Sequence, residues 1–378
     1  MKKILMIVFL FITIASPVCA ESGKTDFNFG EVNEIINSTD FAQIEGFLSQ
    51  NGAKMSFKEL LNSFLKGENI LQNLTKYAKD LFLYEIKNSA SLLVKLAAAV
   101  IVFSFANTFC GGIFSNSAAD TAFLVCYMIC SFILASVFLE TVSAAKEVIY
   151  KLNYFVSMSM PILMGFIAAS GAAAEAACIN PLVVIGIEVL SSVVNSFFIP
   201  LVFAICVLSL FSGCSKNINI GAFLKTAKSV LKWSMGLVFT LFTGTVSLYG
   251  NFSSSADALT MRAAKYAIGA SVPVVGTLLC DNMSVFTYSC VVIKNAFGAV
   301  SIFVIVFMLA LPVIKTAVIA ICLNLMAALM SAVADEKITN LICDIASAVT
   351  YVLAIVCLVG AVFILSIAII VNTSALPV

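Results

Sequence analysis

The sequence contains no histidine, a single tryptophan and few charged residues, which make up 11% of its 378 positions. Without histidine, the chain cannot use a Ser-His-Asp triad, an imidazole acid–base catalyst or a histidine-ligated metal. Lys and Arg (21) nearly balance Asp and Glu (20), so the strong basic excess typical of nucleic-acid-binding proteins is also missing. These absences exclude histidine-based enzymes and make nucleic acid an unsuitable partner.

Hydrophobic residues make up 61% of the chain, and its mean hydropathy is +1.09. A soluble domain is about half apolar and about a quarter charged, so this composition indicates an integral membrane protein with the lipid bilayer as its surroundings. Residues 21–90 hold seven Lys and ten Asp or Glu, whereas residues 345–378 hold no charged residue. The chain therefore divides into a polar N-terminal segment and a membrane domain.

The chain has twelve cysteines, but their spacing does not suggest a disulfide framework or a metal site. No CxxC motif occurs, and Cys126 and Cys130 fall on one face of an apolar run. In such runs a free cysteine behaves as a small apolar residue. We expect no bound metal and no cofactor.

Residues 1–20 have the pattern of a secretory signal peptide. Lys2 and Lys3 precede the apolar stretch 4–18, and cleavage is expected after Ala20. A retained signal anchor is the alternative, while a lipoprotein at Cys19 is disfavoured by the preceding Pro-Val. In either of the first two cases, residues 21–90 lie outside the cytoplasm.

The extracytoplasmic segment 21–90 is predicted to be helical. Asp40 with Gln43, and Ser56 with Glu59, have capping-box spacing ahead of periodic apolar runs. Gly67 is expected to end the second of these helices. With few core positions of its own, the segment is expected to dock on the membrane domain or on a partner.

The membrane domain, residues 91–378, is predicted to be all-α with six to eight crossings, since about 20 residues suffice to cross a bilayer. The candidate spans are 92–109, 122–139, 152–170, 182–211, 230–250, 267–293, 296–333 and 345–371. The runs 182–211 and 296–333 are too long for one straight span, so each is expected to be a hairpin or a broken pair near Pro200 or Pro312. Lys216, Lys225, Lys228 and Lys232 form a basic island, which the positive-inside rule places in the cytoplasm.

Two stretches 112 residues apart suggest an internal duplication of 122–228 and 234–340. The offset pairs Ser159 with Ser271, Pro161 with Pro273, Cys178 with Cys290, Gly186 with Gly298, and Pro200 with Pro312. Matching Pro- and Gly-interrupted segments in two halves are typical of a central site in a transporter. The alternative is that proline and glycine only kink membrane helices for packing. The predicted helix-break residues are Pro161, Pro200, Gly269, Pro273, Gly276 and Pro312.

Several charged residues are predicted at membrane depth, where each must face the bundle interior or a partner. Glu188 and Lys315 are the deepest, and Lys95, Lys294, Asp281 and Asp344 lie near span ends. They have three interpretations: an ion or substrate path, snorkelling at the interface (for Lys95 and Lys294 above all), or an ion pair such as Glu188 with Lys315. No Walker A motif or paired-carboxylate motif occurs, so the chain is not expected to hydrolyse nucleotide or to be an enzyme.

The stretch "DALTMRAAKYAIGASVPVVGTLLCDNMSVFTYSCVVIKNAFGAV" (257–300) resembles the signature region of the stage III sporulation protein AE family. The segments "LPVIKTAVIA" (311–320), "ADEKITNLICDIASAV" (334–349), "FILSIAIIV" (363–371) and "MPILMGFIAASGAAAEAACINP" (160–181) are similar to the same family. So is the outer segment "SFKELLNSFLKGE" (56–68). The resemblance adds weight to a set of positions that match the sequence pattern of the family, without assigning them any chemistry: Lys265, Gly269, Pro273, Gly276, Asp281, Lys294, Lys315, Asp335 and Glu336.

The resemblance implies a polytopic component of the complex that joins the mother cell to the engulfed forespore, located in the mother-cell-derived membrane. It also implies partners from the same operon, among them ring-forming subunits and a cytoplasmic ATPase, and stage II sporulation protein Q across the intermembrane space. The chain is expected to form or support a channel that late forespore development needs. A structural scaffold for the ring subunits and a stand-alone secondary transporter are the alternatives. The candidate path or packing residues are Glu188, Lys315, Asp281, Lys265, Lys294, Asp335 and Glu336.

Overall fold

The computed structural model describes residues 29–51, 55–66, 94, 98, 116–212, 221–245, 275–331 and 336–373. These residues form helices and their turns, with no strand among them, which confirms the all-α prediction. Three short helices come first: α2 (Phe29–Ser38), α3 (Ala42–Gln50) and α4 (Phe57–Leu65). The long elements are α6 (Asn116–Ala169), α7 (Ala173–Val193), the π-helical turn η2 (Val194–Phe198), α8 (Ile199–Ser212), α10 (Val275–Met330) and α11 (Glu336–Thr373). Residues 221–245 are also helical.

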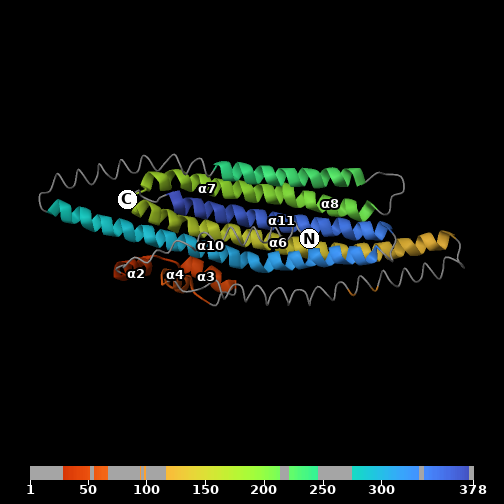
Figure 1. Cartoon of the computed structure of the whole chain (residues 1–378), viewed down its shortest axis with the longest axis horizontal. Helices are drawn as coiled ribbons and strands as arrows, with labels where there is room; N and C mark the ends of the chain where they lie inside the picture. Colours follow the sequence, from red (N-terminus) through yellow and green to blue (C-terminus); the bar gives the residue numbers. More distant parts are fainter. Residues whose placement is uncertain are drawn as a thin grey trace.

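The long helices lie lengthwise beside one another in one bundle (Figure 1). α6 has 54 residues, so at 1.5 Å per residue it is about 81 Å long. α11 contacts α6, α7, α8 and α10 and is therefore the central helix. Its most apolar 18-residue stretch has a mean hydropathy of 3.1. The bundle is thus built around a helix that carries no charge after Asp344 and that other helices cover.

The number of spans differs from the prediction. The predicted spans 122–139 and 152–170 belong to the single helix α6, and most of 267–293 and 296–333 belongs to α10. Among the described residues, four helices are long and apolar enough to cross a membrane, so six to eight crossings are not confirmed. The predicted gap in α6 contained Glu140, Lys146, Glu147 and Lys151, which are charged but favour helix well enough to continue it. The predicted span 92–109 lies outside the described residues.

The predicted proline breaks also differ from the structure. Pro161 lies inside α6 and Pro312 inside α10, and both helices continue through them. The run from Ala173 to Ser212 is likewise one continuous rod rather than a hairpin, with Pro200 just after the wide turn η2. A π-helical turn next to a proline accommodates the missing N–H donor without ending the helix. Packing against neighbouring helices allows proline inside long apolar helices in the same way.

A tight turn joins α6 to α7. Gly171 has φ of 89°, in the left-handed region where glycine has no steric penalty. The amide of Gly171 donates to the carbonyl of Ala168 (3.1 Å), and that of Ala172 donates to the carbonyl of Ile167 (3.2 Å). These bonds satisfy carbonyls at the end of α6. The turn therefore sends α7 back along α6 as an antiparallel neighbour.

The internal duplication stays a prediction, because Gly269 and Pro273 lie outside the described residues. Two of its paired glycines nevertheless share one packing role. A Cβ on Gly186 would lie 2.8 Å from Cε2 of Phe242, and a Cβ on Gly298 would overlap the side chain of Val371. Both glycines are thus sites where a neighbouring helix approaches closely.

The N-terminal helices α2–α4 pack on the bundle through aromatic rings, as the docking prediction required. The ring of Phe297 in α10 lies 5.1 Å from that of Phe57 and 6.2 Å from that of Phe41. Phe47 of α3 lies 5.6 Å from Tyr154 and 6.0 Å from Phe155, both on α6. We call α2–α4 together the N-terminal unit.

One of the two predicted capping boxes is present as expected. Ser56 accepts a hydrogen bond from the amide of Glu59 (3.1 Å), and the Glu59 carboxylate accepts one from the amide of Ser56 (2.9 Å). Asp40 instead accepts from the amide of Ala42 (2.9 Å), and the N-cap position of α3 is Phe41. The predicted capping box of Asp40 with Gln43 was therefore wrong. Gly67 lies outside the described residues.

Replacing Ser56 by alanine should destabilise α4 by about 1 kcal/mol, because the amide of Glu59 loses its acceptor. Hydrogen exchange of the amides in 57–65 is the measurement, and they should exchange faster. Ser63→Ala is the matched control, since Ser63 lies inside the same helix and caps nothing. Equal exchange in the two variants would show that the capping box does not stabilise α4.

Candidate functional site: the charged residues of the bundle

The best-buried ion pair described joins residues 228 and 344. Lys228 Nζ lies 2.7 Å from Asp344 Oδ1, and the two side chains are only 16% and 23% exposed. Lys228 belongs to the helix 221–245 and Asp344 to α11, so the pair fastens an outer helix to the central one. Removing either partner of such a pair would leave the other charge buried and uncompensated, which destabilises the fold.

A second ion pair joins α6 to α10. Lys315 Nζ lies 2.6 Å from Glu140 Oε1, with side chains 29% and 65% exposed. The suggested pair of Lys315 with Glu188 was therefore wrong, because α6 presents Glu140 to Lys315. Glu188 lies on the exposed face of α7, and among the described residues no ion pair reaches it.

Lys294 is fully buried in α10, so the predicted snorkelling to an interface was wrong. It lies one helical turn before Phe297, where the N-terminal unit packs on α10. The residue is not left without a partner. A lysine at this depth is stable only when its charge is compensated, so Lys294 belongs to the packed interior.

The other predicted residues are dispersed. Glu336 is the first residue of α11 and is exposed. Asp281 and Gly276 lie in the first turns of α10, in a part whose side chains fall outside the description. Lys95, Lys265 and Asp335 also lie outside the described residues. The path residues whose side chains are described, Glu188, Lys315, Lys294 and Glu336, come from α7, α10 and α11, and the ion pair of Lys315 is with Glu140 rather than with another of them.

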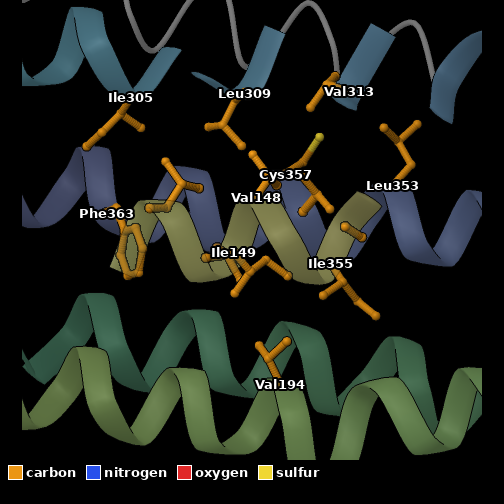
Figure 2. Packing of buried hydrophobic residues seen from close by; sticks show 14 of the residues in the cluster. Val148, Ile149, Val194, Ile305, Leu309, Val313, Leu353, Ile355, Cys357 and Phe363 are labelled. Atoms are coloured by element: carbon orange, nitrogen blue, oxygen red, sulfur yellow. The ribbon is translucent and has the colours of Figure 1, made fainter. Parts of the chain in front are cut away.

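The bundle interior is filled with apolar side chains (Figure 2). Val148 and Ile149 of α6, Val194 of η2, Ile305 and Leu309 of α10, and Leu353 and Phe363 of α11 are all buried. A cavity of about 10 Å³ between these helices is lined by Val142, Ala145, Ile149, Ile199, Val202, Val352 and Ile355. A space of that size with only apolar walls holds no water.

Several buried hydroxyl groups are satisfied within their own helix, whereas the buried Ser301 hydroxyl has no hydrogen-bond partner among the described residues. Thr141, Ser159 and Ser366 each donate to the carbonyl four residues earlier, at 2.7 to 2.8 Å. Such bonds let a polar side chain sit in an apolar interior without a partner on another helix. The described interior therefore offers apolar packing rather than a polar route along the bundle.

The charged residues that sequence reasoning missed are the ion-pair partners of the predicted ones, Glu140 for Lys315 and Lys228 for Asp344. Glu140 appeared to be one of several interleaved charges, and Lys228 to be part of a cytoplasmic basic island. Their pairing partners are separated from them by 175 and 116 positions, respectively. A single sequence contains no signal for such pairs; the only local hint is a charge beside a long apolar run.

Comparison with known proteins shows which family the chain belongs to. The model of the family described as "Stage III sporulation protein AE" matches residues 55–374. The chain belongs to this family. The stage III sporulation protein AE of Bacillus subtilis (strain 168) is 23% identical over 331 residues, which cover 87% of this chain and 81% of that protein. No solved structure matches the chain.

Membership of the stage III sporulation protein AE family confirms the resemblance seen in the sequence. The family match starts at Met55, beside the capping box of α4, and continues to the end of α11. It therefore includes both ion pairs between helices and the aromatic contact at Phe297. The family is described as a sporulation protein and not as an enzyme.

Proposed function

We propose that the chain is a structural membrane component of the complex that links mother cell and forespore, and that late forespore development needs it. The family membership and the four apolar helices support this role. On this proposal it resides in the mother-cell membrane around the forespore, with its N-terminal segment extracytoplasmic. Its partners are ring-forming subunits and the ATPase of the same operon, and stage II sporulation protein Q across the intermembrane space.

The observation that favours a structural role over a conduit within one chain is the filled centre of the bundle. α11 has no charged residue after Asp344 and is covered by α6, α7, α8 and α10. Two pairs of charges between helices, Lys315 with Glu140 and Lys228 with Asp344, form ion pairs at 2.6 and 2.7 Å, which hold helices together. A channel in the complex would then lie between chains or subunits. A stand-alone secondary transporter gains no support, because α6 continues through Pro161 where a broken helix was expected.

Neutralising Glu188 separates the structural role from the conduit. Glu188→Gln removes an exposed charge from α7 that makes no ion pair with the described residues, so a structural component should retain both complex assembly and late forespore gene expression. Co-purification of the complex and a forespore reporter gene are the two measurements. Glu188→Asp, which keeps the charge, is the matched control.

Loss of reporter expression in Glu188→Gln with an intact complex would contradict the structural proposal and support a path at Glu188. Asp281→Asn provides the same comparison at a second predicted path residue. If both neutral variants behave as the unmodified chain does, the conduit loses the two acidic residues proposed for it.

A further inference from the structure

The exposed face of α6 changes from apolar to mainly polar at Glu140. Before this residue the exposed side chains are bulky and apolar: Leu124 (49% exposed), Val125 (52%), Met128 (60%), Ile129 (50%), Phe132 (77%) and Leu139 (50%). From Glu140 onward the same face carries Lys146, Glu147 and Tyr150. One helix therefore presents two surfaces, one suited to acyl chains and one suited to water.

Neighbouring helices continue the apolar surface at the same level. The Tyr127 hydroxyl donates to the carbonyl of Leu210 (3.0 Å), so the end of α8 lies beside this part of α6. On α8, Val207 and Phe211 are 47% and 60% exposed. On α10, Leu325 and Leu329 are 55% and 59% exposed. The apolar surface therefore surrounds one end of the bundle.

Charged groups mark both limits of this apolar surface. At one limit, Lys337 Nζ lies over the ring of Phe123 at 5.5 Å. At the other, Lys315 pairs with Glu140. The 17 steps from Phe123 to Glu140 correspond to about 26 Å of helix. The hydrocarbon core of a bilayer is about 30 Å thick, and lysine side chains extend to its boundary, so the length fits one bilayer.

The charges between these limits are compatible with lipid. Lys228 and Asp344 neutralise each other between two helices, as an ion pair in a membrane must. Lys232 lies over the ring of Tyr351 at 5.7 Å, and the adjacent Trp233 is 71% exposed. An exposed tryptophan beside a lysine is typical of a membrane–water interface. Lys225 lies one turn from the start of the helix 221–245, within reach of the other interface.

The opposite half of the bundle carries the N-terminal unit. Phe47 of this unit packs on Tyr154 and Phe155, beyond Glu140 along α6. Glu34, Asp40 and Glu59 of the unit are exposed. Each would cost several kcal/mol in hydrocarbon, so the unit lies in water or at the interface. On α7, the exposed apolar residues Ile185 and Val189 are interrupted by Glu188.

We infer that the bilayer surrounds only the end of the bundle between the Phe123–Lys337 and Glu140–Lys315 levels, and that the rest of α6 stands outside the hydrocarbon with the N-terminal unit. The occupant of the apolar surface is the acyl region of the lipid. The inference rests on the proposed membrane location and deepens it. The uncharged stretch 345–371 was predicted to be a membrane span. On this placement, much of it is apolar because it forms the core of a protruding bundle.

Hydroxyl-radical footprinting of the full chain in phospholipid vesicles tests this placement. Met128 and Tyr150 are similarly exposed on the same helix, 60% and 72%. Tyr150 should be oxidised about tenfold more than Met128, because hydrocarbon excludes water. The denatured chain is the control, in which the intrinsically reactive Met128 should be oxidised readily. A carbene probe dissolved in the bilayer should label the peptide containing Met128 and spare that containing Tyr150.

Oxidation of Met128 with protection of Tyr150 would put the bilayer at the other end and overturn the inference. Protection of Met128 without carbene labelling would overturn it as well, since protein, such as a second copy, would then cover the surface. Recovery of the chain in carbonate-washed membranes tests the proposed function separately. A chain absent from that fraction is no membrane component, whereas a membrane-bound chain with the wrong footprint contradicts the inference alone.

Discussion

Asp344→Lys should destabilise the bundle by about 3 kcal/mol, which is the lower end of the cost of breaking a buried ion pair. The substitution replaces a 2.7 Å attraction to Lys228 by the repulsion of two ammonium groups in a site where the side chains are only 16% and 23% exposed. The helix 221–245 should separate from α11 first, because this pair joins them. The measurement is the thermal midpoint of the purified chain in detergent, together with its abundance in the membrane.

The exchange of both charges provides the decisive comparison. The double variant Lys228→Asp with Asp344→Lys restores opposite charges at the same two positions and should recover most of the lost stability. Lys225→Asp is the matched control, since Lys225 lies on the same helix, is exposed and makes no described ion pair. If the double variant is no more stable than Asp344→Lys alone, the two residues do not form a pair that matters for stability.

Local features of the fold could be predicted from the sequence because their signals lie within a few residues. The Ser56–Glu59 capping box needs only four consecutive positions, and it is present at the predicted place. The all-α class follows from long apolar runs with few turn residues. The family was recognisable from short stretches such as 257–300 and 334–349, and the family match covers both.

The number and length of the helices could not be predicted in the same way. Hydropathy marks the charged residues 140–151 as a gap between two spans, yet α6 continues through them. Likewise, Pro161 signals a break only when nothing holds the two halves in line. Whether a polar stretch or a proline ends a helix depends on the neighbouring helices, which a local pattern does not contain.

The charged site shows the same limit. Lys315 was predicted to need a partner inside the bundle, and it has one, but the partner is Glu140 rather than Glu188. The choice between the two acids depends on which helix lies beside α10 at that level. Lys294 was expected near a surface, and the packing of the N-terminal unit on this part of α10 explains its burial. How deeply a residue is buried in a bundle depends on how the helices pack, and this cannot be read from the residues next to it in the sequence.

Phe297→Ala should cost about 4 kcal/mol, within the range for removing a fully buried phenylalanine. Its ring is 0% exposed and lies between Phe57 (5.1 Å) and Phe41 (6.2 Å) of the N-terminal unit and Phe166 (6.3 Å) of α6. The substitution removes three ring contacts at once and opens a cavity beneath α4. Because the N-terminal unit is attached here by aromatic packing, it should be released before the long helices separate.

Hydrogen exchange resolves this order of events. In Phe297→Ala, amides of 57–65 should lose protection while those of 345–371 in α11 keep theirs. Phe286→Ala is the matched control on the same helix, where the ring is 51% exposed and its loss should change little. Equal loss of protection in both segments would mean that the unit and the bundle unfold together. Unchanged protection of 57–65 would mean that Phe297 does not anchor the unit, and that contacts such as Phe47 with Phe155 hold it instead.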